Sequence, residues 1–117
     1  MKLLVVGAGR MGVRHIKAIL QLMPGCRIAV VDNNKENLGS VQKTFSSSVE
    51  SLSYHSSTEI KGHFDGAIVS TSAFGRAQII EELVTELGVR NLLIEKPVEQ
   101  SLLEVDRVVS LLNRHGA

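Results

Sequence analysis

Apolar residues alternate along this chain between short unbroken runs and longer stretches in which they recur every three or four positions. The unbroken runs predict strands, buried on both faces of a sheet, at residues 3–6, 26–31, 64–71 and 91–95. The stretches with helical spacing predict helices at residues 11–22, 35–45, 74–87 and 101–113. The serine-rich segment 46–57 is harder to interpret, and a short strand at 51–54 is expected within it.

Residues at the ends of the predicted helices agree with this assignment. Pro24 and Gly25 end the first helix and turn the chain toward the next strand. Gly88 suits the end of the third helix. Ser101 and Glu104 have the capping-box spacing with which a helix begins.

Strands and helices therefore alternate from beginning to end. Such alternation predicts an α/β domain in which a parallel sheet is covered by helices on both faces. Because crossovers are right-handed, few arrangements remain. We expect a single three-layer, doubly wound Rossmann-type domain over residues 1–117, with strand order 3-2-1-4-5. Ligands of such sheets bind at the carboxyl ends of the strands, here in the crevice between the first and fourth.

Three glycines follow the first strand with the spacing G-x-G-x-x-G: Gly7, Gly9 and Gly12. A strand, a glycine turn and a helix in succession are typical of dinucleotide-binding domains. Gly7 turns the chain sharply, Gly9 leaves room for a pyrophosphate, and Gly12 lets the helix pack closely on the strand. The first turn of the helix, with Arg10 and Met11, offers unpaired N–H groups to the phosphates. Arg10 either faces these phosphates or is solvated.

The second predicted strand ends in Asp32, about twenty residues after the last glycine, as in dinucleotide-binding domains. A carboxylate there, with Asn33 beside it, accepts hydrogen bonds from the ribose hydroxyls of adenosine. A competing interpretation is that Asp32 only caps the helix that begins near Asn34. Since a carboxylate repels a 2′-phosphate and no arginine directly follows it, the sequence predicts NAD in preference to NADP.

Two later strands also carry polar residues at their carboxyl ends. Thr71 and Ser72 follow one strand and Glu95 and Lys96 the other, so all four are expected at the rim of the crevice. The Lys96 amine can polarise or deprotonate a substrate hydroxyl there. The alternative is a surface lysine before a proline turn. Pro97 restricts Lys96 to extended geometry, but the sequence leaves the isomer of the bond between them open.

Together these motifs resemble the N-terminal domain of the Gfo/Idh/MocA oxidoreductases, the family of glucose-fructose oxidoreductase and inositol dehydrogenase. The resemblance extends over essentially all 117 residues, and it rests on VVGAGRMGVRH at 5–15, Asp32, FDGAIVST at 64–71 and LIEKP at 93–97. It implies an NAD(P)-dependent oxidoreductase acting on a CH–OH carbon of a sugar, cyclitol or similar polyol. It also implies that Lys96 is the catalytic residue beside the nicotinamide.

The chain departs from the family pattern in two ways. The family often has Thr-Pro after its fourth strand and a His four residues after that proline, where this chain has Thr71-Ser72 and Arg76. Arg76 is expected either to pair with an anionic substrate or phosphate or to be solvated. The family's second α/β domain, which supplies most of the substrate pocket, is absent from this chain. We therefore expect either an inactive part of a longer enzyme or a stand-alone cofactor module.

Two other functions stay open. A non-catalytic, NAD-binding regulatory module would share the glycine turn, the acid and the size, whereas the Glu95-Lys96-Pro97 motif favours the oxidoreductase. A methyltransferase has a similar glycine-rich turn and acid. Its ligand, however, lacks the pyrophosphate that Gly12 and the helix terminus serve.

Composition and charge narrow the remaining classes. A net charge of +1, with three Phe, one Tyr and no Trp, argues against nucleic acid as a partner. No apolar stretch approaches the roughly 20 residues of a membrane span or resembles a secretory signal, so a cytoplasmic protein without a membrane partner is expected. One cysteine and no histidine pair with ligand spacing predict neither a disulfide nor a metal site. His15 is expected to be a packing or surface residue, and no other His or acid is expected near Lys96. The sequence leaves open whether the chain forms a homo-oligomer.

Overall fold

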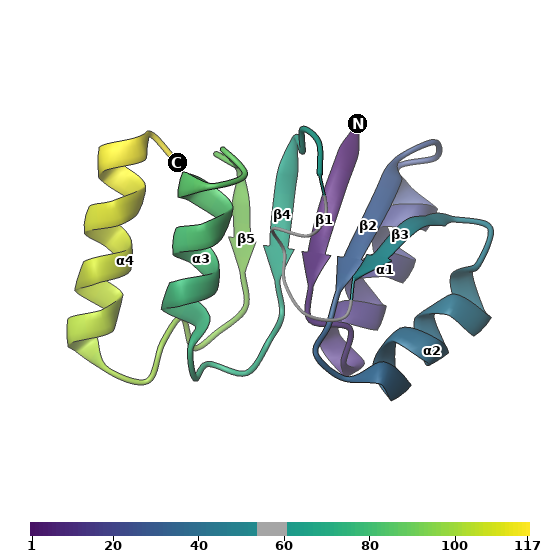
Figure 1. The fold of residues 1–117 in the computed structure, drawn as a ribbon, viewed down its shortest axis with the longest axis horizontal. Helices are drawn as coiled ribbons and strands as arrows, with labels where there is room; N and C mark the ends of the chain where they lie inside the picture. The colour runs from purple at the N-terminus through teal and green to yellow at the C-terminus, as the bar shows by residue number, and fades with distance from the viewer. Residues whose placement is uncertain (54–60) are drawn as a thin grey trace.

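In a computed structural model, the chain forms a five-stranded sheet covered by helices (Figure 1). The structure describes residues 1–53 and 61–117. The strands, all parallel, are β1 (Lys2–Val6), β2 (Arg27–Val31), β3 (Val49–Ser53), β4 (Gly66–Val69) and β5 (Leu92–Ile94). The helices are α1 (Arg10–Leu22), α2 (Lys35–Phe45), α3 (Arg76–Thr85) and α4 (Leu102–His115).

The strand order is β3-β2-β1-β4-β5, which confirms the predicted order. The chain winds outward from β1 to β2 and β3 on one side, and then returns to β4 and β5 on the other (Figure 1). Val6, the last residue of β1, pairs with Val31 of β2 and with Val69 of β4. The carboxyl ends of three strands therefore lie at the same level, at the point where the winding reverses. In open α/β sheets this is where ligands bind.

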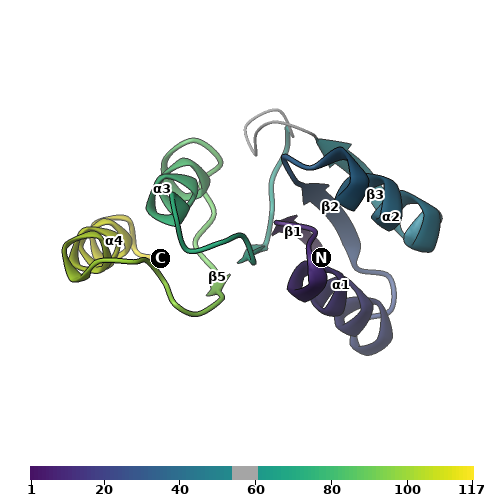
Figure 2. The same cartoon turned by 90° about the horizontal axis from the view of Figure 1, so that it is seen from below.

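The central strands β2, β1 and β4 pack on both of their faces, which explains why their apolar runs are unbroken. Successive side chains of a strand point to opposite faces. Leu4 and Val6 thus pack in one core with residues of α3 and α4, whereas Val5 packs in a second core with residues of α1 and α2. Figure 2 shows α1 and α3 on opposite sides of the sheet. The predicted three-layer architecture is confirmed.

Several boundaries differ from the predicted ones. The third strand covers Val49–Ser53 rather than 51–54, because serine-rich sequence carries little alternation from which to set its ends; Tyr54 lies outside the described residues. The third helix is shorter than 74–87 and begins at Arg76, since Gly75 before it has a left-handed backbone (φ +74°). The strands predicted at 64–71 and 91–95 are also shorter at each end.

The helix caps show which polar residues begin a helix. Asn34 caps α2, because its side chain accepts hydrogen bonds from the N–H groups of Glu36 and Asn37. Ser101 caps α4 and accepts from the N–H of Glu104 at 3.2 Å, as its spacing predicts. In the described part of the chain, no helix is both long and apolar enough to span a membrane. Residues 1–53 and 61–117 also hold no group of three metal-ligating side chains.

Candidate functional site

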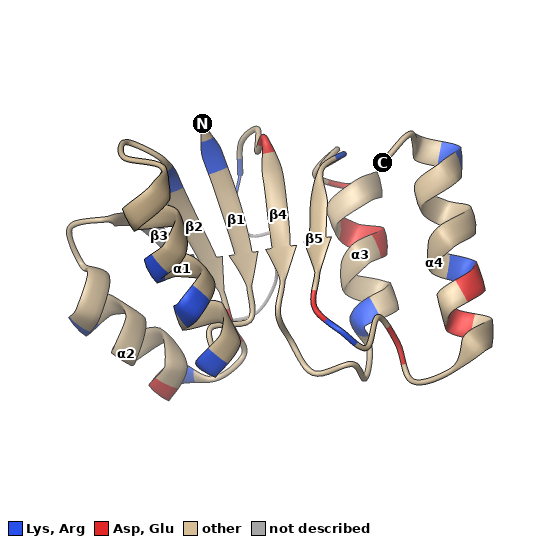
Figure 3. Ribbon diagram, turned by 180° about the vertical axis from the view of Figure 1, so that it is seen from behind, with Lys and Arg blue, Asp and Glu red and all other residues tan. Residues whose placement is uncertain are grey.

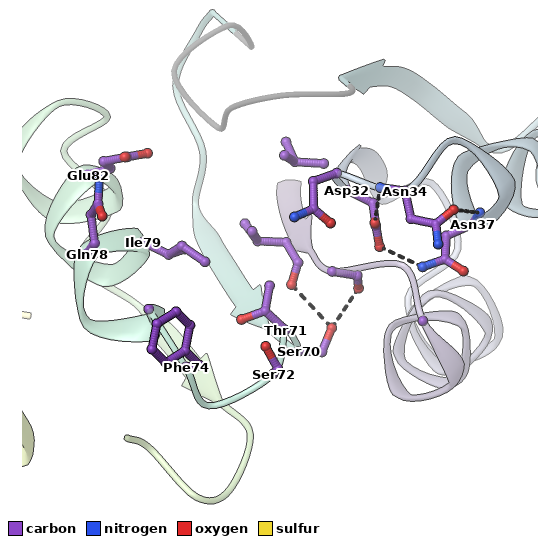
Figure 4. Close-up of a pocket in the computed structure, with 16 residues that line it drawn as sticks. Asp32, Asn34, Asn37, Ser70, Thr71, Ser72, Phe74, Gln78, Ile79 and Glu82 are labelled. Carbon is purple, nitrogen blue, oxygen red and sulfur yellow. Dashed lines mark hydrogen bonds between the residues drawn. The ribbon is translucent and has the colours of Figure 1, made fainter. Parts of the chain in front are cut away.

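A pocket of about 540 Å³ opens at the carboxyl ends of the central strands (Figure 4). Its walls come from three segments: the glycine turn after β1, the residues after β2, and the loop after β4 with the first turns of α3. Of the residues predicted for the site, the pocket is lined by Gly7, Gly9, Asp32, Asn33, Thr71 and Ser72. The others do not line it: Arg10, Met11, Gly12, Glu95 and Lys96.

The glycine turn is packed so tightly that side chains are excluded at its first and third glycines. Gly7 has φ +96°, and a Cβ there would lie 2.7 Å from the Thr71 nitrogen. A Cβ on Gly12 would lie 1.9 Å from the carbonyl oxygen of Gly7. The Ser70 hydroxyl donates to that same oxygen at 2.7 Å and so ties the loop after β4 to the turn. The sharp turn and close helix packing predicted for Gly7 and Gly12 are thus present.

Gly9 differs from its two neighbours because a Cβ there would meet no atom within 4 Å. It lines the pocket and is the N-cap residue of α1, and no side chain among the described residues caps this helix. Uncapped N–H groups at a helix N-terminus form a ready site for an anion. The open space at Gly9 and the free helix terminus together fit a phosphate group.

Asp32 presents a carboxylate that is fixed by three donors on the chain. It accepts from the N–H of Ala8 at 2.6 Å, from the N–H of Asn34 at 2.7 Å and from the side-chain amide of Asn37 at 3.2 Å. Asp32 is 8% exposed and lines the pocket. Since Asn34 is the helix cap, the competing interpretation of Asp32 as only a cap is wrong. A carboxylate can accept about four hydrogen bonds, so capacity for a ligand hydroxyl remains.

The hydroxyl of Thr71 stands out in the opposite wall. Its Oγ1 atom is buried and has no hydrogen-bond partner among the described residues. Buried polar atoms without partners are rare in proteins and call for an explanation. Thr71 itself lines the pocket, although this oxygen atom is covered.

The pocket carries an acidic rather than a basic lining. Its described residues include Asp32 and Glu82 but no Lys or Arg. Figure 3 shows basic residues, in blue, along α1; Arg10 and Arg14 are exposed and lie outside the lining. Arg10 therefore does not reach this pocket in the structure.

Arg76 is not solvated, so that interpretation made from the sequence is wrong, whereas its pairing with an anionic substrate or phosphate stays a prediction. Arg76 is 2% exposed. Its guanidinium donates to the carbonyl oxygens of Thr71, Glu95 and Pro97 and so joins the loops that follow β4 and β5. Burial lowers the pKa of Arg76, and the nearby Glu95 and Glu99 oppose this effect. Arg76 is therefore a structural bridge at the rim of the crevice.

Lys96 lies beside the crevice rather than in the pocket wall, and it is exposed. The Lys96–Pro97 bond, which the sequence left open, is cis. Glu95 is paired with His15, whose Nε2 lies 2.7 Å from Oε1 of Glu95. His15 thus contacts the residue that precedes Lys96, a contact that the sequence did not predict. This hydrogen bond with His15 is the main reason why the pKa of the Glu95 carboxyl is lowered.

The doubly wound sheet, the glycine turn and the fixed acid after β2 define a dinucleotide-binding Rossmann domain. A family model described as "Oxidoreductase family, NAD-binding Rossmann fold" matches residues 1–117. The chain therefore belongs to the Gfo/Idh/MocA oxidoreductase family, as its motifs predicted. No curated protein sequence matches the chain.

Solved structures with the same fold include several oxidoreductases. The apo scyllo-inositol dehydrogenase from Lactobacillus casei has a TM-score of 0.83 at 19% identity, over 98% of this chain and 33% of its own. The WlbA dehydrogenase from Bordetella pertussis, in complex with NADH and UDP-GlcNAcA, has a TM-score of 0.83 at 22% identity, over 99% and 33%. An oxidoreductase from Agrobacterium radiobacter, in complex with NAD+, L-tartaric acid and magnesium, has a TM-score of 0.84 at 20% identity, over 98% and 33%. The chain thus spans about a third of the length of these structures.

Proposed function

We propose that this chain binds NAD and is the dinucleotide-binding part of an oxidoreductase acting on a CH–OH group of a sugar, cyclitol or similar polyol. One observation carries the proposal: the pocket holds the open, uncapped helix terminus at Gly9 on one side and the fixed carboxylate of Asp32 on the other. The first suits a pyrophosphate and the second an adenosine ribose. Inositol dehydrogenases among the structures of the same fold, and family membership, support the substrate class.

In this proposal the chain's own residues hold the dinucleotide and place a proton-transfer group. Gly9 and the first turn of α1 receive the phosphates, Asp32 and Asn33 receive the ribose, and Thr71 and Ser72 form the opposite wall. Bound NAD supplies the hydride acceptor. Lys96, at the carboxyl end of β5, is the residue that polarises or deprotonates the substrate hydroxyl.

The cofactor preference provides a first test. NAD is expected to bind more tightly than NADP, by about 1–4 kcal/mol, because a 2′-phosphate would lie a few ångströms from the Asp32 carboxylate. No cation in the described lining offsets this repulsion. Asp32→Asn keeps the size of the side chain but removes its charge, so it should narrow the difference in affinity between the two nucleotides.

Asp106→Asn, on the exposed side of α4, is the matched control and should leave the difference in affinity unchanged. Calorimetric titration measures both affinities, and equal binding of NAD and NADP by the wild-type chain would contradict the assignment.

The second test concerns turnover. The 117-residue chain is expected to bind NAD saturably but to oxidise no polyol. Hydride transfer needs the substrate carbon within about 3–3.5 Å of the nicotinamide, and this positioning supplies a large share of the rate. The chain spans about a third of the oxidoreductases it resembles in fold, so we expect the rest of the substrate pocket to come from elsewhere. Nicotinamide absorbance with inositol and glucose as substrates is the measurement; robust turnover would show that this one domain suffices.

A further inference from the structure

His15, in the second turn of α1, contacts the residue that precedes Lys96. Its Nε2 atom lies 2.7 Å from Oε1 of Glu95, 80 residues away in the sequence. The two side chains are only 20% and 24% exposed, so water competes little for this hydrogen bond. The contact joins the helix that begins at the glycine turn to the end of β5.

The same segment is held from the other face of the sheet. Arg76, at the start of α3, donates to the carbonyl oxygens of Glu95 and Pro97, which flank Lys96. Because α1 and α3 lie on opposite sides of the sheet (Figure 2), residues 95–97 are held on both faces. The bonds from Arg76 fix the backbone, whereas the bond from His15 fixes a side chain.

The direction of the Glu95 side chain bears on Lys96. Glu95 continues β5, since its N–H donates to the carbonyl of Val69 at 2.9 Å. Successive side chains of an extended chain point to opposite sides. We propose that His15 is a positioning residue: by holding the Glu95 carboxylate against α1, it sets the side on which Lys96 presents its amine at the crevice. The chemical role of Lys96 rests on the proposed function, whereas the orientation of its side chain by His15 does not.

A lysine needs such placement because its side chain is long and rotates freely. A fixed backbone direction limits the space that the amine explores, and this reduces the entropy lost when it engages a ligand. The hydrogen bond with His15 lowers the pKa of the Glu95 carboxyl, while burial opposes this and the Lys96 N–H and Arg76 add to it. Glu95 is therefore a carboxylate at neutral pH and a strong acceptor for His15.

The first experiment uses the chain without nucleotide. In His15→Ala, the pKa of the Glu95 carboxyl should rise toward its ordinary value, and the NMR order parameters of the side-chain methylene groups of Glu95 and Lys96 should fall, because the bond from His15 holds a side chain. His15→Gln retains an N–H donor and should restore both. His63→Ala is the matched control, because His63 is 84% exposed and lies 3.8 Å from Asp65. This control should change neither quantity.

The second experiment separates the nicotinamide end of the ligand from the rest. ADP-ribose carries the adenosine, the pyrophosphate and the second ribose but no nicotinamide, so the ratio of NAD to ADP-ribose affinity reports contacts near Lys96. Lys96→Met should lower this ratio by about two- to tenfold. His15→Ala should lower it similarly, and the double variant should lower it no further, since both changes remove the same contact.

The two experiments distinguish failure of this inference from failure of the proposed function. Unchanged order parameters at Glu95 and Lys96 in His15→Ala would overturn the positioning role. An equal loss of order along all of α1 would also overturn it, because His15 would then only support the fold. A wild-type chain that binds neither NAD nor ADP-ribose would contradict the proposed function, while the order parameters would still decide the role of His15.

Discussion

Gly9→Val is expected to abolish NAD binding and to leave the fold intact. The backbone at Gly9 is extended (φ −68°, ψ −168°), which any residue can adopt, and a Cβ there meets no atom within 4 Å. The valine side chain therefore causes no clash within the chain. Gly9 lines the pocket, however, so the added methyl groups occupy the space proposed for the pyrophosphate. Calorimetric titration should show that NAD binds about a hundredfold more weakly or not at all, a loss of about 2.8 kcal/mol or more.

Two further glycines provide the controls for this substitution. Gly39 of α2 also has open space at its Cβ position, so Gly39→Val should keep both the fold and NAD binding. Gly12→Val should lose the fold, because its Cβ would lie 1.9 Å from the carbonyl oxygen of Gly7. Circular dichroism and thermal unfolding separate the two kinds of loss. If Gly9→Val binds NAD as tightly as the wild-type chain does, the phosphates do not lie at this turn.

The parts of the molecule that sequence reasoning predicted well are those with a local signal. Unbroken apolar runs placed β1 and β2, and the crossover rule then left few strand orders. The glycine spacing predicted Gly7 at the turn and Gly12 packed against it. Both positions need a residue without a Cβ, and the atoms that impose this need include backbone close by in the sequence. Asp32 was predicted from two local signals: it ends the second apolar run, and it lies about twenty residues after the last glycine.

The contacts that sequence reasoning missed join residues far apart along the chain. His15 and Glu95 are separated by 80 residues, and nothing near either one indicates the other. Arg76 did leave a signal, because it is one and two helical turns before Ile80 and Leu83, which face the core. That spacing places Arg76 on the buried side of α3. A charged residue at such a position must find acceptors inside the protein, and the strand-end carbonyls are the ones within its reach.

Arg76→Met is expected to lower the free energy of unfolding by about 3–5 kcal/mol. The substitution leaves the carbonyl oxygens of Thr71, Glu95 and Pro97 without their donor. Each buried carbonyl that loses its partner costs about 1–3 kcal/mol, and the lower part of the summed range applies because water reaches part of these loops. Arg76→Lys should fall between Met and wild type, since an ammonium lacks the planar fork that reaches several carbonyls at once.

Arg107 provides the matched control for this last prediction. It is also an arginine with partners, in ion pairs with Glu81 at 2.6 Å and Glu104 at 3.5 Å, but its side chain is 56% exposed. Exposed ion pairs contribute about 0–1 kcal/mol, so Arg107→Met should change the unfolding free energy by no more than that. Urea unfolding of the two methionine variants measures the difference. If Arg76→Met costs no more than Arg107→Met, the buried guanidinium is not what joins the loops after β4 and β5, and residues 95–97 must be held by other contacts.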